Sequence, residues 1–422
     1  MWTKSPDLNG DGQINVQDKL TYEAALAYGE SLSFAGYDDW RLPSIKELYS
    51  LIDFSGTTGF GDQNSSSVPS NAEPYIDTNY FDFAYGDTSA GERYIDAQFA
   101  TSTKYVSTTM NGSETMFGVN FADGRIKGYG FEQPNGGQKT FYALFVRGNE
   151  FYGQNDFVDN GNGTITDNAT GLTWLGADSG SFDAGPFSDG SLNWEEALSW
   201  CESLDFAGRA DWRLPNAKEL QSIVDYTRSP DTTNSAAIDP LFTVTYLPNG
   251  VNNVGSGNYP HTWTSTTHLD GIPAEARTVY IAFGEAQGIM TGTLMDVHGA
   301  GAQRSDLKSG DPSQLPVSQG PQGDVQSVYN YARCVSGGST AYTAGNVGNT
   351  TTTTNIQSPQ QQIGQGGPQQ GQTPQEAISA CTGLSQGVAC SFDTPNGTVS
   401  GTCGTPPNEG QLVCIPAGGP PQ

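Results

Sequence analysis

The chain of 422 residues is poor in basic side chains. It has 18 lysines and arginines against 45 aspartates and glutamates, which gives a formal net charge of −27. We expect neither nucleic acid nor an anionic membrane surface as a partner, because both reward positive charge. The sequence also lacks any apolar run of about 18 residues, so we expect no membrane span.

The groups that build common enzyme sites are scarce as well. The histidines are His261, His268 and His298, and the first two flank a predicted strand with no further metal ligand beside them. The serine and threonine runs at 107–109 and 265–267 have no histidine or general base that recurs next to both. Nucleotide-binding glycine patterns, the zinc-protease motif and the nucleophile elbow are absent. The sequence therefore predicts a protein that is not an enzyme.

What the chain does have is an internal repeat. Residues 20–53 recur without a gap at residues 192–225, and 20 of the 34 paired positions are identical. The best-matched stretches read FAGYDDWRLPSIKEL and FAGRADWRLPNAKEL. A duplication of this quality predicts two copies of one independently packed unit. We place the first repeat at residues 1–150 and the second at 151–337.

Each repeat is expected to begin with a helix, to continue through the DWRLP turn into a second helix, and then to form short strands and long polar loops. In the turn, tryptophan and leucine should be core residues. Arg41 and Arg213 should pair with internal carboxylates such as Glu47 and Glu219. The strands matched between the repeats are 105–109 with 262–267, 119–124 with 281–286, and 143–148 with 330–335.

Six cysteines, an even number, agree with export from the cytosol. Cys201 lies in the first helix of the second repeat and Cys334 near its end, and we match them to Gly29 and Gly148 of the first repeat. Because both cysteines are absent together from the first repeat, we predict a disulfide between Cys201 and Cys334. Two unrelated buried thiols are the alternative.

The C-terminal part changes character. Residues 338–372 are of low complexity, rich in Gly, Gln, Thr and Pro, and are predicted to be a flexible linker. A small module should follow over 373–422, with a capping box at Thr373–Glu376 and a hairpin at Asn396-Gly397. It is too short to hold much core, so disulfides should stabilise it. The pairing of its four cysteines stays open among three possibilities: Cys381, Cys390, Cys403 and Cys414.

The clearest chemical motif is DLNGDGQINVQD at residues 7–18, called here the calcium loop. It matches the EF-hand pattern at every ligand position, with glycine at the sixth position for the sharp turn. We expect Ca²⁺ as the cofactor and a helix over 16–33 that leaves the loop; an acidic turn without metal is the alternative. The predicted ligands are Asp7, Asn9, Asp11, Gln13 through its carbonyl, Asn15 and Asp18.

The calcium loop is specific to the first repeat. In the second repeat Ser179, Ser181, Ala184 and Gly190 occupy the corresponding positions, so the ion is not part of the basic plan of the repeat. The loop resembles those of dockerins and of bacterial extracellular calcium modules. A dockerin pairs two such loops, and this chain has one.

The second repeat carries a longer series of motifs: FVDNGNGTITDNATGLTW, DWRLPNAKEL, WTSTT and YARCV. This series resembles the family typified by the C-terminal domain of the Legionella collagen-like protein, and the resemblance covers both repeats. It implies an α+β fold of two tandem C-type-lectin-like, formylglycine-enzyme-like repeats, here followed by a small disulfide-rich β tail. It also implies a secreted or surface protein, and its recurrent cysteine pair corresponds to Cys201 and Cys334.

We therefore expect a secreted or surface-attached, non-enzymatic binding or adhesion protein. Its candidate partner is a glycan or surface polymer, with Tyr75, Tyr80, Phe81 and Tyr85 as candidate stacking residues. The namesake of the family binds sulfated polysaccharide, and we expect that ligand not to carry over because basic residues are few. The formylglycine enzyme needs a cysteine pair of its own, which this sequence lacks.

The alternative is a structural subunit of an extracellular fibre or matrix. Met1 aligns with Thr173, so the first repeat lacks the hairpin that precedes the second. A sheet edge left in this way could accept a strand from another chain, which would lead to self-association. No signal peptide is visible, and we expect the chain to begin inside its first repeat with any export signal upstream.

Overall fold

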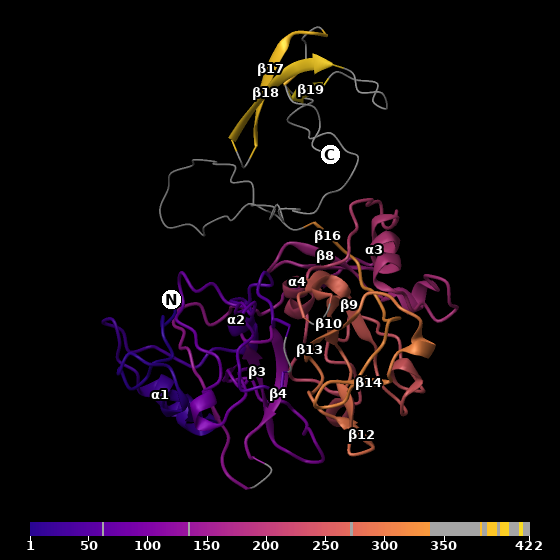
Figure 1. Cartoon of the computed structure of the whole chain (residues 1–422). Coiled ribbons are helices and arrows are strands. Elements are labelled where there is room, and N and C mark those ends of the chain that lie inside the picture. The colour runs from indigo at the N-terminus through magenta and orange to yellow at the C-terminus, as the bar shows by residue number, and fades with distance from the viewer. Residues whose placement is uncertain are drawn as a thin grey trace, which may run out of the picture. The chain divides into compact units, whose positions relative to one another are not determined.

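The computed structural model describes residues 1–60, 63–133, 136–270, 273–337, 380–381, 386–394, 397–404 and 413–416. The chain forms two compact units, Met1–Ser339 and Thr340–Gln422 (Figure 1). The larger unit contains both repeats and is mostly β with short helices. The predicted linker at 338–372 and the capping box at Thr373–Glu376 lie outside the described residues.

The first repeat forms short helices and strands in the order η1 (Val16–Asp18), β1 (Leu20–Thr21), α1 (Tyr22–Ser31), α2 (Ile45–Tyr49), η2 (Thr88–Ala90), β2 (Gln98–Phe99), β3 (Thr115–Asn120), β4 (Arg125–Gly130) and β5 (Thr140–Phe141). The second repeat begins with β6 (Phe157–Asp159), β7 (Thr164–Asp167), β8 (Leu172–Leu175), η3 (Ser179–Phe182), α3 (Trp194–Glu202), α4 (Ala217–Ser222), α5 (Pro230–Thr233) and η4 (Val251–Asn253). It continues with β9 (His261–His268), η5 (Ala274–Ala276), β10 (Arg277–Ala282), β11 (Gln287–Met290), β12 (Thr293–Asp296), β13 (Gln303–Leu307), η6 (Pro312–Gln314), β14 (Ser318–Gln319), β15 (Asp324–Val325) and β16 (Val335–Gly337).

The two repeats share one antiparallel sheet of six strands, in the order β2, β3, β4, β13, β10, β9. In Figure 1 the purple strands β3 and β4 lie beside the orange strands β13 and β10. Val119 pairs with Ile126 in the first repeat as Ile281 pairs with Gln303 in the second. At the centre, Ile126 pairs with Gln303 itself. The sheet is therefore built around an approximate two-fold axis between β4 and β13.

The repeats consequently do not pack as independent units, which corrects that part of the expectation. The largest hydrophobic core holds residues of both repeats, among them Leu48 and Leu220. Helices α2 and α4 meet reciprocally: the Lys46 ammonium donates to the Ser222 carbonyl (2.7 Å) and the Lys218 ammonium to the Ser50 carbonyl (2.9 Å). Each lysine thus binds the helix end of the other repeat at matching positions.

The tryptophans of the DWRLP turn have the same surroundings in both repeats. Trp40 and Trp212 are buried, with 3% and 2% of their surface exposed. Each indole donates to the carbonyl of a phenylalanine six residues earlier, Phe34 (3.1 Å) or Phe206 (3.2 Å). The prediction that this turn forms a core nucleus in each repeat is confirmed.

The arginine of the turn also behaves as predicted. Arg41 binds Glu47 through two hydrogen bonds of 2.7 and 2.6 Å, and Arg213 binds Glu219 at the same two distances. Each glutamate also accepts the main-chain N–H of the residue that caps the second helix. The bidentate pair therefore fixes the turn against the helix that follows it.

The helix predicted over 16–33 is wrong at its start. After η1 the chain becomes extended, and Leu20 pairs with Phe141 in the β1–β5 ladder. The helix α1 begins one residue after Thr21, whose hydroxyl accepts the N–H of Ala24 (3.3 Å). The pairing of Leu20 competes with helix formation there, and Thr21 then provides a new N-cap.

One strand match is confirmed and another is out of register. The match of 119–124 with 281–286 holds, as the paired registers show. The equivalent of 262–267 is 99–104 and not 105–109, because the Ala100 N–H donates to the carbonyl of Tyr142 as the Trp263 N–H does to that of Tyr331 (2.9 and 2.8 Å). Loops of unequal length before the strands hid this register in the sequence.

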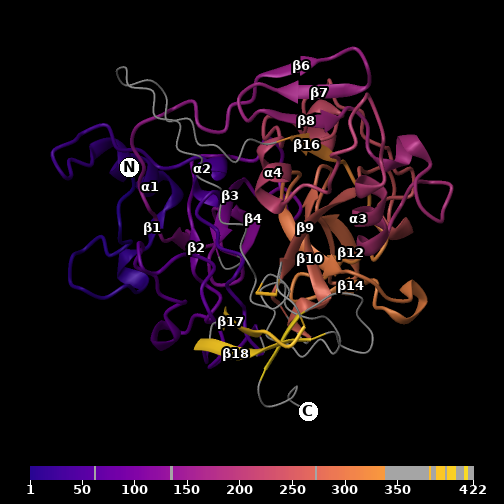
Figure 2. The same ribbon diagram turned by 90° about the horizontal axis from the view of Figure 1, so that it is seen from above.

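The hairpin predicted before the second repeat is present as β6, β7 and β8, and Figure 2 shows these strands side by side with β16. The smaller unit has an antiparallel sheet of three strands, β17 (Ala389–Thr394), β18 (Gly397–Gly404) and β19 (Val413–Pro416). Its disulfides join Cys381 to Cys403 and Cys390 to Cys414. This settles the pairing that the sequence left open.

Candidate functional site

The calcium loop turns through hydrogen bonds from main-chain N–H groups to its own side chains. The Asp7 carboxylate accepts the N–H of Gly10 (2.8 Å) and of Gly12 (2.9 Å). The Asn9 side chain accepts the N–H of Asp11 (2.8 Å). Gly12 has a φ of +83°, a conformation that favours glycine at the sixth position of the loop.

The last residue of the loop holds its two ends together. Asp18 is fully buried. Its Oδ1 accepts the N–H groups of Leu8 (3.0 Å) and Asn9 (3.3 Å), and its Oδ2 accepts that of Asn15 (3.0 Å). Asp18 is thus a structural residue as well as a predicted ligand.

The residue types of the loop fit a hard dication, because aspartate, asparagine and carbonyl oxygens are the ligands that calcium prefers. Two ligands of one ion lie at most about 4.8 Å apart, twice the usual Ca–O distance. In the described part of the chain, the only three His, Cys, Asp or Glu residues that meet this spacing are disulfide-bonded cysteines of the tail. An ion would therefore have to draw the loop carboxylates together, and the calcium site stays a prediction.

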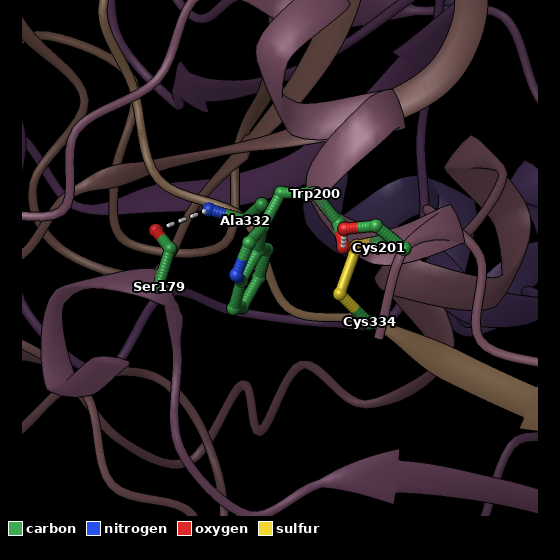
Figure 3. The surroundings of a disulfide bond; sticks show 6 residues. Ser179, Trp200, Cys201, Ala332 and Cys334 are labelled. Carbon is green, nitrogen blue, oxygen red and sulfur yellow. Dashed lines mark hydrogen bonds between the residues drawn. A yellow bond between two sulfur atoms is a disulfide. The ribbon is translucent and has the colours of Figure 1, made fainter. Parts of the chain in front are cut away.

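Cys201 of α3 and Cys334 beside β16 form a disulfide with their Cα atoms 5.5 Å apart. Both cysteines are fully buried. Figure 3 shows Trp200 beside this bond, with Ser179 accepting the N–H of Ala332 nearby (3.0 Å). The bond connects the first helix of the repeat to its closing strand across 133 residues of sequence.

The match of Cys334 to Gly148 is wrong. The Thr3 N–H donates to the carbonyl of Phe145 (2.9 Å), as the Leu175 N–H donates to that of Cys334 (3.0 Å). Phe145 is therefore the equivalent of Cys334, so the segment YALFVRG matches YARCVSG. The different loop lengths ahead of the closing strand shifted the alignment by three residues.

An aromatic ring replaces the disulfide in the first repeat. A Cβ atom on Gly29, the equivalent of Cys201, would lie 3.1 Å from Cδ1 of Phe145. Tyr28 stacks on Phe145 with ring centroids 5.1 Å apart, and Tyr28 is the equivalent of Trp200. Glycine thus makes room for a ring that fills the place of two sulfur atoms.

The histidines at the two ends of β9 have different surroundings. The ring of His268 stacks on Tyr75 (5.3 Å), and its Nε2 lies 2.9 Å from the carbonyl oxygen of Asp123. Burial lowers the pKa of His268 to about 3, so the ring is neutral. The ring of His261 stacks on Tyr280 (4.0 Å), and neither of its nitrogens has a hydrogen-bond partner among the described residues.

A pocket with a volume of about 470 Å³, called here the junction pocket, opens where the repeats meet. Arginines from three strands of the shared sheet line it: Arg125 of β4, Arg277 of β10 and Arg304 of β13. Asp270 and Asp324 lie between them. The wall of the pocket therefore needs both repeats, because Arg125 belongs to the first and the other four residues to the second.

Two of these arginines are compensated by buried carboxylates. Arg125 pairs with Asp270, and Arg304 pairs with Asp324. Burial raises the pKa of each carboxyl group, but the adjacent guanidinium outweighs this and holds both pKa values well below the usual range. Both carboxylates are therefore ionised at neutral pH.

The third arginine is compensated only at a distance, by the charges of Asp306 and Asp270. Arg277 forms no ion pair with a described residue, and its hydrogen bond is a long one of 3.5 Å from Nη1 to the carbonyl of Ser305. Buried Nε of Arg125 and Nη1 of Arg304 have no hydrogen-bond partner among the described residues either. Unsatisfied buried donors are costly. Arg277 is the partly exposed arginine of the three, so its guanidinium is the one that an acceptor in the pocket can reach.

The junction pocket was not predicted from the sequence. Its arginines differ from their counterparts in the other repeat: Arg277 matches Thr115, and Arg304 matches Lys127. The bulk charge of the chain also pointed away from an anion site. The sequence contained one signal: the equivalent positions Lys127 and Arg304 are both basic in a chain with few basic residues. This equivalence can be recognised only when the strand register is known.

Comparison with known families supports the repeat assignment. The family model described as the Lcl C-terminal domain matches residues 1–147 and 163–295, which together are more than half of the chain. The chain therefore belongs to the Lcl C-terminal domain family and carries two tandem copies of its domain. No curated protein and no solved structure matches the chain. Among the described residues, no helix is long and apolar enough to cross a membrane.

Proposed function

We propose that this chain is an extracellular or surface-associated binding protein that takes an acidic group of its ligand into the junction pocket. The observation that carries this proposal is the convergence of Arg125, Arg277 and Arg304 with hydrogen-bond donors left free. A guanidinium presents paired N–H groups that suit carboxylate, sulfate or phosphate oxygens. The volume of the pocket is in the range of small-ligand sites.

Family membership and the disulfides support a location outside the cytosol. A C-type-lectin-like mode of binding and a role in adhesion are parts of the same proposal. The low overall content of basic residues argued against an acidic polymer, but Arg277 forms no ion pair with a described residue, so its charge remains to attract such a ligand once the other two arginines are paired. A sulfate- or carboxylate-bearing surface polymer is therefore the proposed ligand.

The proposed role is binding and not catalysis. A carboxyl group that acts as a general acid at neutral pH needs a raised pKa. In the junction pocket the pKa values of Asp270 and Asp324 are both lowered. Their carboxylates serve to orient arginines, which is the arrangement of a recognition site.

We expect Arg277→Gln to weaken binding of an acidic ligand by roughly 10- to 100-fold, because hydrogen bonds to charged groups contribute about 1.5–3 kcal/mol. Calorimetry with heparin, polyglucuronate and a neutral polysaccharide measures this effect. Arg209→Gln is the matched control, since it removes the same charge from a residue outside the pocket. Equal affinity of the Arg277 variant and the parent, or no binding of any acidic polymer, would overturn the proposal.

We also propose that Ca²⁺ binds the calcium loop and stabilises the first repeat. Calcium at 100 times its dissociation constant should raise the free energy of unfolding by about 2.7 kcal/mol, seen as a higher melting temperature than in EDTA. Asp11→Ala should abolish this difference; Asp11 is exposed, and its carboxylate accepts a hydrogen bond only from the main-chain N–H of Gln13. Asp38→Ala, at another exposed aspartate, is the control. An unchanged melting temperature and no bound calcium in equilibrium dialysis would count against the site.

A further inference from the structure

The second repeat contains a separate pocket of about 390 Å³, called here the repeat-two pocket. It is lined by aromatic, aliphatic, amide and hydroxyl side chains together with one histidine and one exposed carboxylate, and none of its lining residues is a lysine or arginine. This chemistry differs from that of the junction pocket. An anion is therefore not the ligand that these walls suit.

The walls of the repeat-two pocket come in part from a segment that is longer in this repeat. Between β13 and Asn330 the second repeat has 22 residues (308–329), whereas the first has 10 (131–140) between β4 and the equivalent Phe141. Pro312, Ser327 and Tyr329 of the longer segment line the pocket. The repeat thus departs from the common plan where the pocket lies.

Polar atoms without partners lie at this pocket. His261 lines it, is 1% exposed, and has no hydrogen bond at either ring nitrogen. Its Nδ1 lies 3.5 Å from Asp306, whose Oδ1 also has no partner among the described residues. The first repeat has Gln98 at the position of His261, and Gln98 donates to Asp96 (3.1 Å). The polar group is satisfied in the first repeat and has no hydrogen-bond partner among the described residues in the second.

An aromatic pair lines another part of the pocket. Phe187 and Tyr329 meet edge to face with ring centroids 4.9 Å apart, and 46% of Phe187 is exposed. Asp189 and Asn252 also line the pocket and offer a carboxylate and an amide group. Exposed rings combined with such groups provide an apolar face and hydrogen-bonding partners within one site.

We propose that the repeat-two pocket binds a neutral sugar. The C–H face of the sugar ring packs on Phe187 and Tyr329, and its hydroxyl groups bond to the exposed Asp189 and Asn252, with the unpartnered ring of His261 as a further polar group in the wall. Sugar hydroxyl groups both donate and accept hydrogen bonds, so they suit a carboxylate, which accepts, and an amide, which does both. This site is independent of the acidic ligand proposed for the junction pocket.

The test uses the full chain and a set of neutral sugars: glucose, galactose, mannose, N-acetylglucosamine and their β-linked disaccharides. Saturation-transfer NMR identifies a binder, and calorimetry gives its affinity. We expect Phe187→Ala and His261→Gln each to weaken binding by about tenfold or more. His261→Gln copies the residue of the first repeat, so the fold should tolerate it, and Phe60→Ala is the control for an exposed phenylalanine outside the pocket.

The outcomes separate the two sites. Sugar binding that Phe187→Ala weakens and Arg277→Gln leaves unchanged supports the repeat-two pocket whatever the acidic ligand does. No binding of any sugar of the set at about 10 mM, a concentration that would detect millimolar affinity, overturns the inference. Binding that is equal in the parent, Phe187→Ala and His261→Gln overturns it as well, because the sugar would then lie elsewhere.

Discussion

Replacing both Cys201 and Cys334 by alanine should lower the free energy of unfolding by between about 2 and 5 kcal/mol. The bond closes a sequence separation of 133 residues, so its loss gives the unfolded chain much more freedom. Both cysteines are buried, so the smaller alanines would also leave a gap beside Trp200. Chemical denaturation of the parent and the double variant measures the difference.

The first repeat supplies a matched control for this prediction. The pair Cys201→Gly and Cys334→Phe reproduces Gly29 and Phe145, where a ring occupies the space of the disulfide. We expect this variant to be more stable than the double alanine variant, because the gap is filled, and less stable than the parent, because the cross-link is gone. A double alanine variant that unfolds at the denaturant concentration of the parent would show that packing, and not the bond, holds the repeat closed.

The features that the sequence predicted correctly depend on short separations along the chain. Trp40 bonds to a carbonyl six residues away, and Arg41 binds Glu47, also six residues away. Such contacts are contained in one motif, so a motif that occurs twice predicts them twice. The turns of the calcium loop are local in the same way, whereas the convergence of its predicted ligands would also require an ion.

The features that escaped prediction depend on distant segments. The strand register of the closing segment is set by pairings such as that of Thr3 with Phe145. Because the loops before this segment differ in length between the repeats, these pairings could not be read from the sequence. The shared sheet rests on Ile126 and Gln303, which belong to different repeats. Sequence similarity between two repeats indicates that they fold alike, but it does not indicate that they pack together. The junction pocket follows from that packing, so it was invisible for the same reason.

A second large effect is expected from Asp296→Asn, which should stabilise the protein above pH 7. Asp296 is buried; it accepts hydrogen bonds from the hydroxyl of Tyr105 in the first repeat (2.8 Å) and from the N–H of Gly299 (2.8 Å). Burial, assisted by the charge of Glu285, raises the pKa of Asp296 from 3.8 to about 7. Between pH 3.8 and about 7, Asp296 is therefore protonated in the folded protein and ionised in the unfolded chain.

The sign of the effect follows from this proton. Between pH 3.8 and about 7 the folded state binds more protons at Asp296 than the unfolded state, so its contribution to stability falls as the pH rises through this window. A pKa difference of about three corresponds to a loss of about 4 kcal/mol, complete above pH 7. Asparagine keeps a neutral amide at this position, so the variant should gain that stability relative to the parent at high pH.

Denaturation of both proteins at a series of pH values from 4 to 9 measures the gain. The difference between Asp296→Asn and the parent should grow up to about pH 7 and then stay constant. Asp270→Asn is the control of opposite sign. Burial raises the pKa of Asp270, but its pairing with Arg125 outweighs this and lowers the pKa, so removal of this carboxylate should destabilise the protein at neutral pH. A pH-independent difference for Asp296→Asn would mean that the carboxyl group titrates normally and that the junction between the repeats admits its charge.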